Sequence, residues 1–595
     1  MNPPPPSKDD IAEIFESTAQ LLELKGENPF KVRAYQNAAR AVELFSGDLA
    51  AAATTPGVLE EIPGLGKHSA AHVRELLETG QFAFFEKLRA EFPAGIFELF
   101  TLPGLGPKKI KALHEQLGVS DLATLEAATQ AGRVAALAGF GKKTADNLLK
   151  ALANRRQNAS LFRLGDVAAG GRALVEALRA HPAVGQVSEA GSFRRRKEVL
   201  HDLDLVLSTK EPASVIEDFV KLPEVAEVLA RGSTKVSVRL RGSGIACDLR
   251  VVSDVEYPFA LHHFTGSKEH NIALRNRALQ TRGWSINDYR ITPAQRPNGT
   301  PGDPVPAIHD EHDFYRALGL DFIPPELREN NGEIEAAAIP GALPALVQLE
   351  NLRGTFHCHT HASDGRNSLE EMAGGARALG LQYLGIADHS KSSFQANGLD
   401  AGRLLAQRAE IDALNARYRH EGVDFRLFSG VECDLLKDGS LDFPDDVLAQ
   451  LDYVVVSVHN AFTLPEAEMT ARIIRALENP HVTMLGHLTG RLLLSREGYA
   501  VDVPAVIDAA ARTGTIIELN ANARRLDMDW RWWKRAKERG VKCAINPDAH
   551  RVSGLQDLWF GVAQARKGWL ERADVVNCLP LGKIEKALRA KRERA

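Results

Sequence analysis

The sequence predicts a multidomain protein of mixed class, α+β in its first part and α/β in its last. Residues 8 to 158 have the pattern of short amphipathic helices broken by glycine and proline. From about residue 164 to 252, segments such as HDLDLVLS and KVSVRLR alternate at period two, as half-buried strands do. From residue 351 onward, apolar strand-like runs alternate with helical stretches, which is typical of parallel βα units closing into a barrel.

Length and composition fit such a chain. The 595 residues correspond to about four domains as a starting expectation, and 44% hydrophobic with 25% charged residues exclude wholesale disorder. A formal net charge of −4 argues against a simple basic nucleic-acid coat protein but leaves room for local basic patches. The N-terminus lacks the apolar core of a signal peptide, no run has the length of a membrane span, and the five cysteines form no CxxC pair. We therefore expect a reduced, soluble, cytoplasmic protein.

A near-repeat of a hydrophobic residue, a G-x-G turn and a helix start marks the N-terminal region. It occurs as IPGLGKHSA from Ile62, LPGLGPKKI from Leu102 and, more loosely, LAGFGKKTA from Leu137. Glycine permits positive φ in the turn, and the following helix N-terminus directs free N–H groups at a phosphate. One copy would indicate only helix packing, but two close copies resemble helix-hairpin-helix DNA-binding elements. The predicted DNA-backbone contacts are Gly64, Gly66, Lys67, Gly104, Gly106, Lys108 and Lys109.

Three carboxylates are predicted to converge beyond a Gly-Ser turn. Asp202 and Asp204 lie two apart on a predicted strand and so project from one face, and Asp248 in IACDLRV can complete the set. Three carboxylates can hold two divalent cations, one beside an attacking hydroxyl and one on a triphosphate. A lone DxD is usually a solvent-facing strand, but the preceding Gly191–Ser192 turn and the third aspartate in a strand context favour a nucleotide site. Ser192 and Arg195 are placed to hold the triphosphate.

The run GSFRRRKEVLHDLDLV resembles the nucleotidyltransferase signature of family X DNA polymerases, and HHFTGSKEHNIALRNRA resembles their nucleotide-binding and thumb segment. The resemblance implies two Mg²⁺ or Mn²⁺ ions on the catalytic aspartates and a template minor-groove contact by Arg275. The implied contacts to the incoming deoxynucleotide are Gly191, Ser192, Arg195, His263, Phe264, Gly266 and Asn271. His72 stands where several members carry the lysine of a 5′-deoxyribose-phosphate lyase, so that activity is left open, although Lys67 is nearby.

Potential metal ligands end successive predicted strands of the C-terminal region. They are His357, His359, Asp364, His389, Glu432, His459, His487, Asp548 and His550. Any one of these histidines alone would more often be a core or surface residue. Together, neutral imidazoles and carboxylates suit Zn²⁺ or Mn²⁺, and the set exceeds what one ion needs. We therefore expect two or three ions and hydrolysis of a phosphodiester by an activated water, with Asp388 orienting a neighbour rather than binding.

The order HxH, SDG, DH, GxE, SxH, GH, DxH resembles the polymerase-and-histidinol-phosphatase (PHP) domain. The whole chain is thus similar to bacterial family X DNA polymerases with a C-terminal PHP domain. This implies a monomer that fills short gaps in gapped or nicked DNA from deoxynucleoside triphosphates, in base-excision or end repair and without a membrane partner. The PHP domain would act as a 3′→5′ exonuclease, with room for abasic-site cleavage. The implied domains are a DNA-end-binding domain (1–90), a second hairpin-bearing domain (91–158), palm (159–255), thumb (256–327), linker (328–350) and PHP domain (351–595).

Three alternatives remain open. The PHP domain can instead be a structural or DNA-positioning module, or hydrolyse pyrophosphate. A second alternative is a non-templated nucleotidyltransferase fused to a small-molecule phosphatase, with the glycine turns as protein-interaction elements. A third, an amidohydrolase-like barrel, shares the first HxH but does not explain the later GxE, SxH and DxH motifs.

Overall fold

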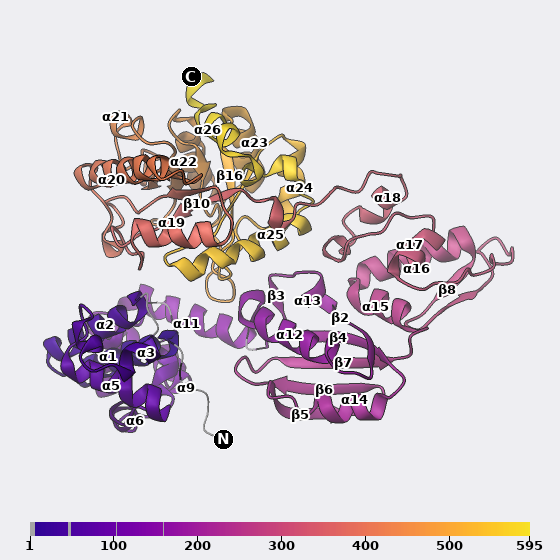
Figure 1. The fold of residues 1–595 in the computed structure, drawn as a ribbon, viewed down its shortest axis with the longest axis horizontal. Helices are drawn as coiled ribbons and strands as arrows, with labels where there is room; N and C mark the ends of the chain where they lie inside the picture. The colour runs from indigo at the N-terminus through magenta and orange to yellow at the C-terminus, as the bar shows by residue number, and fades with distance from the viewer. Residues whose placement is uncertain are drawn as a thin grey trace. The chain divides into compact units, whose positions relative to one another are not determined.

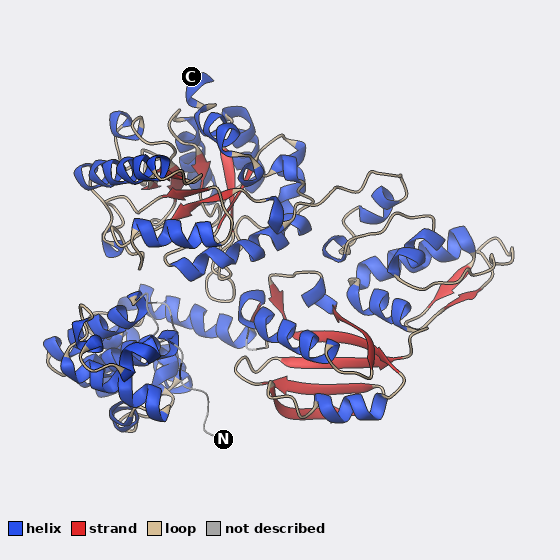
Figure 2. Cartoon of the chain, viewed as in Figure 1, coloured by secondary structure: helices blue, strands red, loops and turns tan. Residues whose placement is uncertain are grey.

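The computed structural model describes residues 6, 8–45, 49–100, 102, 104–158 and 160–594, and the chain divides into two compact units, residues 1–159 and 160–595. Figure 1 follows the chain by colour, and Figure 2 shows that the described strands all belong to the second unit. Two parts of the sequence discussed above lie outside the described residues: residues 1–5 and 7 of the N-terminus, where no signal peptide is expected, and Pro103 of the second glycine turn. No described helix combines the length and apolar character that crossing a membrane requires.

The helices of the first unit surround one apolar core, in which Phe15 and Phe82 are almost fully buried. Gly64 and Gly104 adopt φ of +95° and +80°, which the predicted turns require, and two helices follow directly. The helices are α1 (Lys8–Lys25), α2 (Pro29–Leu44), α3 (Leu49–Thr54), α4 (Val58–Glu61), α5 (Lys67–Thr79), α6 (Ala83–Arg89), α7 (Ile96–Leu99), α8 (Pro107–Leu117), α9 (Leu122–Gln130), α10 (Arg133–Ala136) and α11 (Gly141–Gln157).

The second unit begins with a five-stranded mixed sheet in the order β2-β4-β7-β6-β5. Leu203, Leu205 and Leu207 are fully buried on one face of β4, which leaves the alternate positions for the aspartates. Strands β6 and β7 pair as an antiparallel hairpin. The elements are β1 (Phe162–Arg163), α12 (Leu164–Arg179), β2 (Val184–Ala190), α13 (Gly191–Arg194), β3 (Val199–Leu200), β4 (Asp202–Thr209), α14 (Pro212–Phe219), β5 (Val225–Arg231), β6 (Lys235–Leu240) and β7 (Ala246–Val252).

The segment that follows packs around its own core, and the expected linker 328–350 is part of that core. Ile334 and Leu346 join the apolar cluster, and fully buried Arg328 pairs with Glu311. The polar composition of the segment hid this packing, because its buried charges are paired. The elements are α15 (Tyr257–Thr265), α16 (Lys268–Arg282), β8 (Trp284–Ile286), β9 (Ile291–Pro293), α17 (Glu311–Ala317), η1 (Pro325–Leu327), α18 (Glu333–Ala337) and η2 (Leu349–Asn351).

The C-terminal region is a distorted barrel of parallel strands in two sheets, β10-β11-β12 and β13-β14-β15-β16-β17. Isolated parallel bridges, His389 to Glu432 and Cys358 to Ala549, connect the sheets. The strands are β10 (Gly354–Cys358), β11 (Tyr383–Ile386), β12 (Arg426–Ser429), β13 (Glu432–Asp434), β14 (Val455–Ser457), β15 (Met484–Leu485), β16 (Ile516–Asn520) and β17 (Cys543–Asn546).

Helices alternate with these strands, as the pattern of the sequence predicts. They are α19 (Leu369–Ala378), α20 (Ala401–His420), α21 (Asp445–Leu448), α22 (Glu466–Glu478), α23 (Val503–Thr513), α24 (Trp533–Glu538), α25 (Leu558–Lys567) and α26 (Leu581–Arg589). Short 3₁₀ turns lie between them at η3 (Phe394–Ala396), η4 (Trp530–Trp532), η5 (Val552–Asp557), η6 (Arg572–Asp574), η7 (Val576–Cys578) and η8 (Arg592–Arg594).

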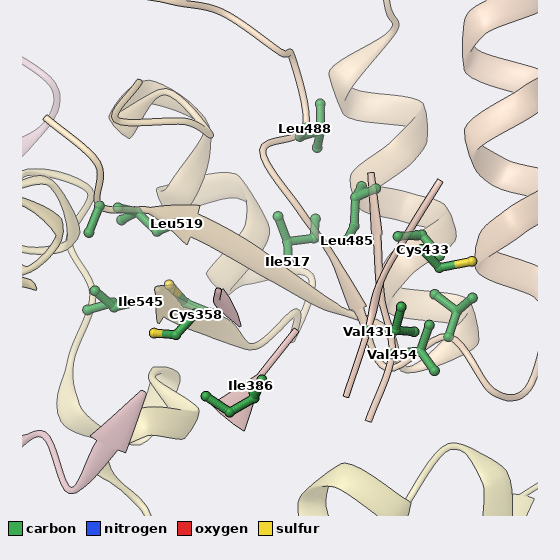
Figure 3. Packing of buried hydrophobic residues seen from close by; sticks show 14 of the residues in the cluster. Cys358, Ile386, Val431, Cys433, Val454, Leu485, Leu488, Ile517, Leu519 and Ile545 are labelled. Carbon is green, nitrogen blue, oxygen red and sulfur yellow. The ribbon is translucent and has the colours of Figure 1, made fainter. Parts of the chain in front are cut away.

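Side chains from consecutive strands form an apolar cluster with side chains of the surrounding helices, such as Met372 of α19 and Ile473 of α22. Figure 3 shows Ile386, Leu485 and Ile517 among them, together with Cys358 and Cys433. Both cysteines are fully buried and belong to this apolar cluster. All five cysteines of the chain are free and buried.

Helix α25 connects the barrel to the first sheet of this unit. Its residues Trp559 and Phe560 pack against the apolar core formed by β4, β6, β7 and α12. The barrel and the sheet therefore share an apolar contact as well as a chain connection.

Candidate active sites

The three aspartates predicted to be catalytic lie on neighbouring strands. Asp204 on β4 is opposite Asp248 on β7, and Asp202 is two residues earlier on the same face. Burial, followed by the charges of Asp202 and Asp248, raises the pKa of Asp204 to about 7. Burial and then Asp248 raise the pKa of Asp202 as well. Mutually repelling, desolvated carboxylates of this kind favour a divalent cation, so the residues present fit the expected metals.

Two residues of β6 that no sequence motif indicates hold Asp248. Lys235 Nζ lies 2.5 Å from Asp248 Oδ2, and Ser237 Oγ donates to Asp248 Oδ1 at 2.6 Å. Among the described residues, the groups of potential ligands within 4.8 Å of one another come from the barrel and do not include this triad. Lys235 thus partly neutralises the charge of Asp248. The carboxylates of the triad lie farther apart than the ligand atoms of the barrel groups.

The Gly-Ser turn is fitted closely to the triad. A Cβ on Gly191 would lie 2.1 Å from Asp204 Oδ2, and Gly191 has a φ of +57°, so only glycine suits this position. Ser192 follows in α13, and Arg195 caps that helix. Arg195 Nη1 donates to the main-chain oxygen of Thr265 at 2.7 Å, which ties the turn to the next predicted nucleotide-binding segment.

The segment from His263 to Arg275 forms a second group beside that contact. Asn271 Nδ2 donates to the main-chain oxygen of His263 at 2.8 Å, and Arg275 Nη2 lies 2.9 Å from His263 Nδ1. The rings of His263 and Phe264 meet edge-on at 4.8 Å, and a Cβ on Gly266 would lie 2.5 Å from Asn271 Oδ1. The predicted nucleotide contacts are therefore brought together in two adjoining groups.

In the first unit, the predicted DNA contacts lie at the starts of two helices. Gly66 and Gly106 are the N-cap residues of α5 and α8, and Lys67 begins α5. Lys108 is in the first turn of α8, where Lys109 Nζ donates to the main-chain oxygen of Gly104 at 2.9 Å. Both turns thus have the geometry expected of a phosphate-binding helix N-terminus.

His72 lies in an aromatic cluster. Its ring stacks on those of Tyr35 and Phe84, with centroids 6.1 and 6.2 Å away, and burial lowers its pKa. A neutral ring therefore stands at the position of the lyase lysine, and the lyase question stays open.

All nine predicted ligands of the barrel gather in one cluster beside the C-terminal ends of its strands. Glu432 is central, with His487 Nε2, His357 Nε2 and His459 Nε2 at 2.9, 3.1 and 3.3 Å and His389 Nδ1 at 2.9 Å. Four groups whose ligand atoms lie within 4.8 Å of one another share members: His357–His359–Asp548, His357–Glu432–His487, His389–Glu432–His459 and His359–Asp364–His389–His550.

The chemistry of this cluster fits metal ions. His357 Nε2, both ring nitrogens of His359, His389 Nδ1 and His487 Nδ1 are buried and make no hydrogen bond. Three of them, His357 Nε2, His359 Nε2 and His389 Nδ1, lie 3.1, 3.2 and 2.9 Å from carboxylate oxygens of the cluster itself. A buried polar atom without a partner costs about 1–3 kcal/mol, and coordination to a metal removes that cost. Burial and then His550 lower the pKa of His359 to about 4, which leaves the neutral imidazole that a metal requires. Burial opposes ionisation of Glu432, but the surrounding histidines outweigh it and hold its pKa well below the usual value.

The backbone at two of the ligands is strained. His357 and Asp548 have φ of +55° and +51°, a region that non-glycine residues rarely adopt. Such strain costs about 1–3 kcal/mol per residue and persists where the surrounding structure imposes it, often at functional sites. Here it aims both side chains into the cluster.

Several residues behind the ligands were not predicted. Glu518 accepts a hydrogen bond from His357 Nδ1 at 2.6 Å, and Asp434 accepts one from His459 Nδ1 at 3.0 Å. Both carboxylates orient ligand rings. Glu518 lies near the end of a predicted strand, so its position was a usable signal. Asp388 is in none of the metal-ligand groups, and it accepts hydrogen bonds from Thr360 and Ser363, in the loop between the ligands His359 and Asp364.

A cavity of about 340 Å³ opens onto the cluster. Phe462, Arg496 and Arg525 contribute to its walls. Arg525 Nε lies 3.3 Å from Asp548 Oδ2, so a cationic group stands beside the ligands. A metal cluster next to arginines can bind and hydrolyse a phosphate ester.

Together, the two sites define an enzyme that joins a nucleotidyl-transfer centre to a multinuclear phosphoesterase centre. Residues 355–522 match the PHP domain family, 260–329 the DNA polymerase beta thumb, 6–82 a helix-hairpin-helix domain and 96–154 a SAM-like helix-hairpin-helix tandem. The chain is 40% identical over 583 residues to the DNA polymerase/3′-5′ exonuclease PolX of Bacillus subtilis (strain 168), covering 98% of this chain and 99% of that protein. The chain belongs to the bacterial PolX family of family X DNA polymerases with a C-terminal PHP domain, and it is a DNA polymerase with 3′→5′ exonuclease activity.

More distant relatives carry a different description. A probable phosphatase of Thermoanaerobacter sp. (strain X514) is 30% identical over 250 residues, 40% of this chain and 95% of that protein. A probable phosphatase of Caldicellulosiruptor saccharolyticus is 29% identical over 204 residues, 33% of this chain and 78% of that protein. The predicted family, fold class and pair of activities are confirmed, whereas the domain boundaries and the individual site residues stay predictions.

Proposed function

We propose that this polymerase fills short gaps during base-excision or end repair in the cytoplasm, acting as a monomer on gapped or nicked DNA. The barrel removes 3′-terminal nucleotides at two or three Zn²⁺ or Mn²⁺ ions. The observation that carries the exonuclease assignment to this cluster is the set of nine converging ligands, several of whose buried ring nitrogens make no hydrogen bond.

In the polymerase centre, Asp202, Asp204 and Asp248 hold two Mg²⁺ or Mn²⁺ ions, which when bound lower the pKa of the primer 3′-hydroxyl and neutralise the triphosphate. Ser192 and Arg195 bind the triphosphate. The closeness of the turn to the triad, set by the absence of a side chain at Gly191, supports this assignment. Arginine suits the role because its planar guanidinium bonds phosphate oxygens in pairs.

The nucleotide's sugar and base lie against His263, Phe264, Gly266 and Asn271, and Arg275 contacts the minor groove of the template. The hydrogen bonds among these residues pre-organise the surface before nucleotide arrives. Upstream DNA is held through its backbone at the two glycine turns. Helix N-termini and lysines there bind phosphate without reading base sequence.

In the exonuclease centre, the nine ligands hold the metal ions, which when bound supply a nucleophilic water and neutralise the scissile phosphodiester. Arg525 and Arg496 line the same cavity and orient the phosphate. Glu518 and Asp434 keep the rings of His357 and His459 in the orientation that coordination needs.

The test separates the two centres on one labelled gapped substrate. Asp202→Ala should abolish nucleotide addition and leave 3′ degradation intact, and His359→Ala should do the reverse. His361→Ala is the matched control, since His361 is exposed two residues from a ligand and is in none of the metal-ligand groups. Metal analysis should find two or three ions on the barrel, fewer after His359→Ala, and a duplex with an abasic site tests endonuclease cleavage. If 3′ degradation survives His359→Ala, the assignment of the exonuclease to this cluster is wrong.

A further inference from the structure

The last residue of α25, Lys567, reaches from the barrel to the polymerase turn. Its side chain has no exposed surface. Its Nζ donates to the main-chain oxygens of Arg195 at 3.2 Å and Glu326 at 3.4 Å, and forms an ion pair with the carboxylate of Glu329. The same Glu329 oxygen lies 3.0 Å from Arg195 Nε. One carboxylate is thus shared between the barrel's lysine and the arginine proposed to bind triphosphate.

The same helix holds the backbone just beyond the turn. Gln564 Nε2 donates to the main-chain oxygen of Arg196 at 2.8 Å. Arg196 has a φ of +58°, a left-handed conformation that costs an ordinary residue about 1–2 kcal/mol. Consecutive carbonyls of Arg195 and Arg196 therefore end on one barrel helix, which keeps this strained stretch from relaxing.

Burying the ammonium group of Lys567 costs free energy, and Lys567 is in none of the metal-ligand groups of the barrel. Removing such a charge from water costs several kcal/mol unless it is paired and hydrogen-bonded. Burial accordingly lowers the pKa of Lys567 to about 8. Its hydrogen-bond partners are all on the polymerase side of the contact, and the barrel supplies the ring of Trp530, 4.5 Å from Nζ. The direction of the hydrogen bonds indicates a role in the polymerase reaction.

Without Lys567, the whole charge of Glu329 would face Arg195 and compete with a triphosphate for its guanidinium. We propose that Lys567 is a positioning residue for nucleotide addition: it shares Glu329 and holds the Arg195 carbonyl, so that the turn presents Arg195 to the triphosphate. The PHP domain then supports polymerase activity through a residue separate from its metal cluster. This inference rests on the proposed triphosphate role of Arg195.

The test compares two buried lysines of the barrel. Lys567→Met should raise the KM for deoxynucleotide about tenfold, the effect of one charge-assisted hydrogen bond, with kcat little changed. Lys591→Met is the matched control. Lys591 Nζ donates to Leu477 O, Val482 O and Thr515 Oγ1 at 2.6–2.9 Å, and burial also lowers its pKa to about 8, but these partners all lie within the barrel. The Lys591→Met variant should leave the KM for deoxynucleotide unchanged. Exonuclease activity on single-stranded DNA reports folding of the barrel in each preparation.

A double variant distinguishes positioning from general loss of packing. Glu329→Gln added to Lys567→Met removes the competing charge and should return KM to within about threefold of wild type, a result that loosened packing does not predict. If Lys567→Met does not fold, Gln564→Ala serves instead, with a KM rise of about threefold expected.

Arg195→Ala separates failure of this proposal from failure of the proposed function. If it raises KM while Lys567→Met and Gln564→Ala do not, the positioning role is overturned and the triphosphate role stands. If Arg195→Ala itself leaves KM unchanged, the triphosphate role is wrong and the positioning role falls with it. A rise in KM of equal size in Lys591→Met would also overturn the proposal.

Discussion

Replacing Asp204 by asparagine should stabilise the metal-free palm while abolishing nucleotide addition. The pKa of Asp204 is about 7 in the folded chain against 3.8 for an ordinary aspartate, because burial and two neighbouring carboxylates oppose its charge. An acid whose folded pKa is the higher one loses stability as pH rises from the unfolded value to the folded one, and the loss is complete above the latter. The full difference corresponds to about 4 kcal/mol at about pH 8, an upper limit because the three carboxylates share their protons.

The pH dependence gives the sharper measurement. The advantage of the Asp204→Asn variant should be about 2 kcal/mol larger at about pH 8 than at about pH 5.5. Hydrogen exchange of peptides from β4 and β7, in the presence of a chelator, reports the local opening free energy of these strands. Asp218→Asn, at an exposed palm aspartate, is the control and should change little. Adding Mg²⁺ should slow exchange in wild type only. Equal exchange of wild type and the Asp204→Asn variant at high pH would refute the electrostatic reasoning.

Three further outcomes follow from the geometry. Gly191→Ala should lower polymerase kcat about a hundredfold, because its Cβ would displace the Asp204 carboxylate, and should leave exonuclease activity intact in parallel assays. Lys108→Ala should weaken binding to gapped DNA and reduce the slope of log affinity against log salt by about 0.9, measured by fluorescence anisotropy, whereas Lys87→Ala should not. Chelation should abolish exonuclease activity and lower the barrel's melting temperature in calorimetry, and Mn²⁺ or Zn²⁺ should restore both; a melting temperature unaffected by chelation would contradict the proposed metal cluster.

Motifs with a fixed spacing were predictable from the sequence. Asp202 and Asp204 share a strand face by the period of two alone, and the barrel histidines stand out because each follows an apolar run. Glu518 stands near the end of one such run and was overlooked, since no motif separates an orienting carboxylate from a binding one. The position of Lys235 beside Asp248 depends on strand pairing, which the period of two does not supply.

Sequence patterns do not predict buried polar contacts between residues that are far apart in the chain. Residues 328–350 have the composition of a linker, yet Glu333 is fully buried against His270. Lys567 likewise carries no sequence signal of its role, because its partners lie more than 200 residues away in the chain. A charged side chain can be buried where a partner is present, and composition does not name the partner.

The apolar side of α25 has a practical consequence for dissecting the enzyme. Trp559 packs on the palm core and also lies over the guanidinium groups of Arg172 and Arg196, 4.4 and 5.2 Å from its ring. Cutting the chain between palm and barrel would expose this surface on both fragments. Truncated halves should then be prone to aggregation, and a weak polymerase fragment would report the loss of this contact rather than the intrinsic activity of the palm. Point substitutions in the full-length chain are therefore the sounder way to assign activities to its two centres.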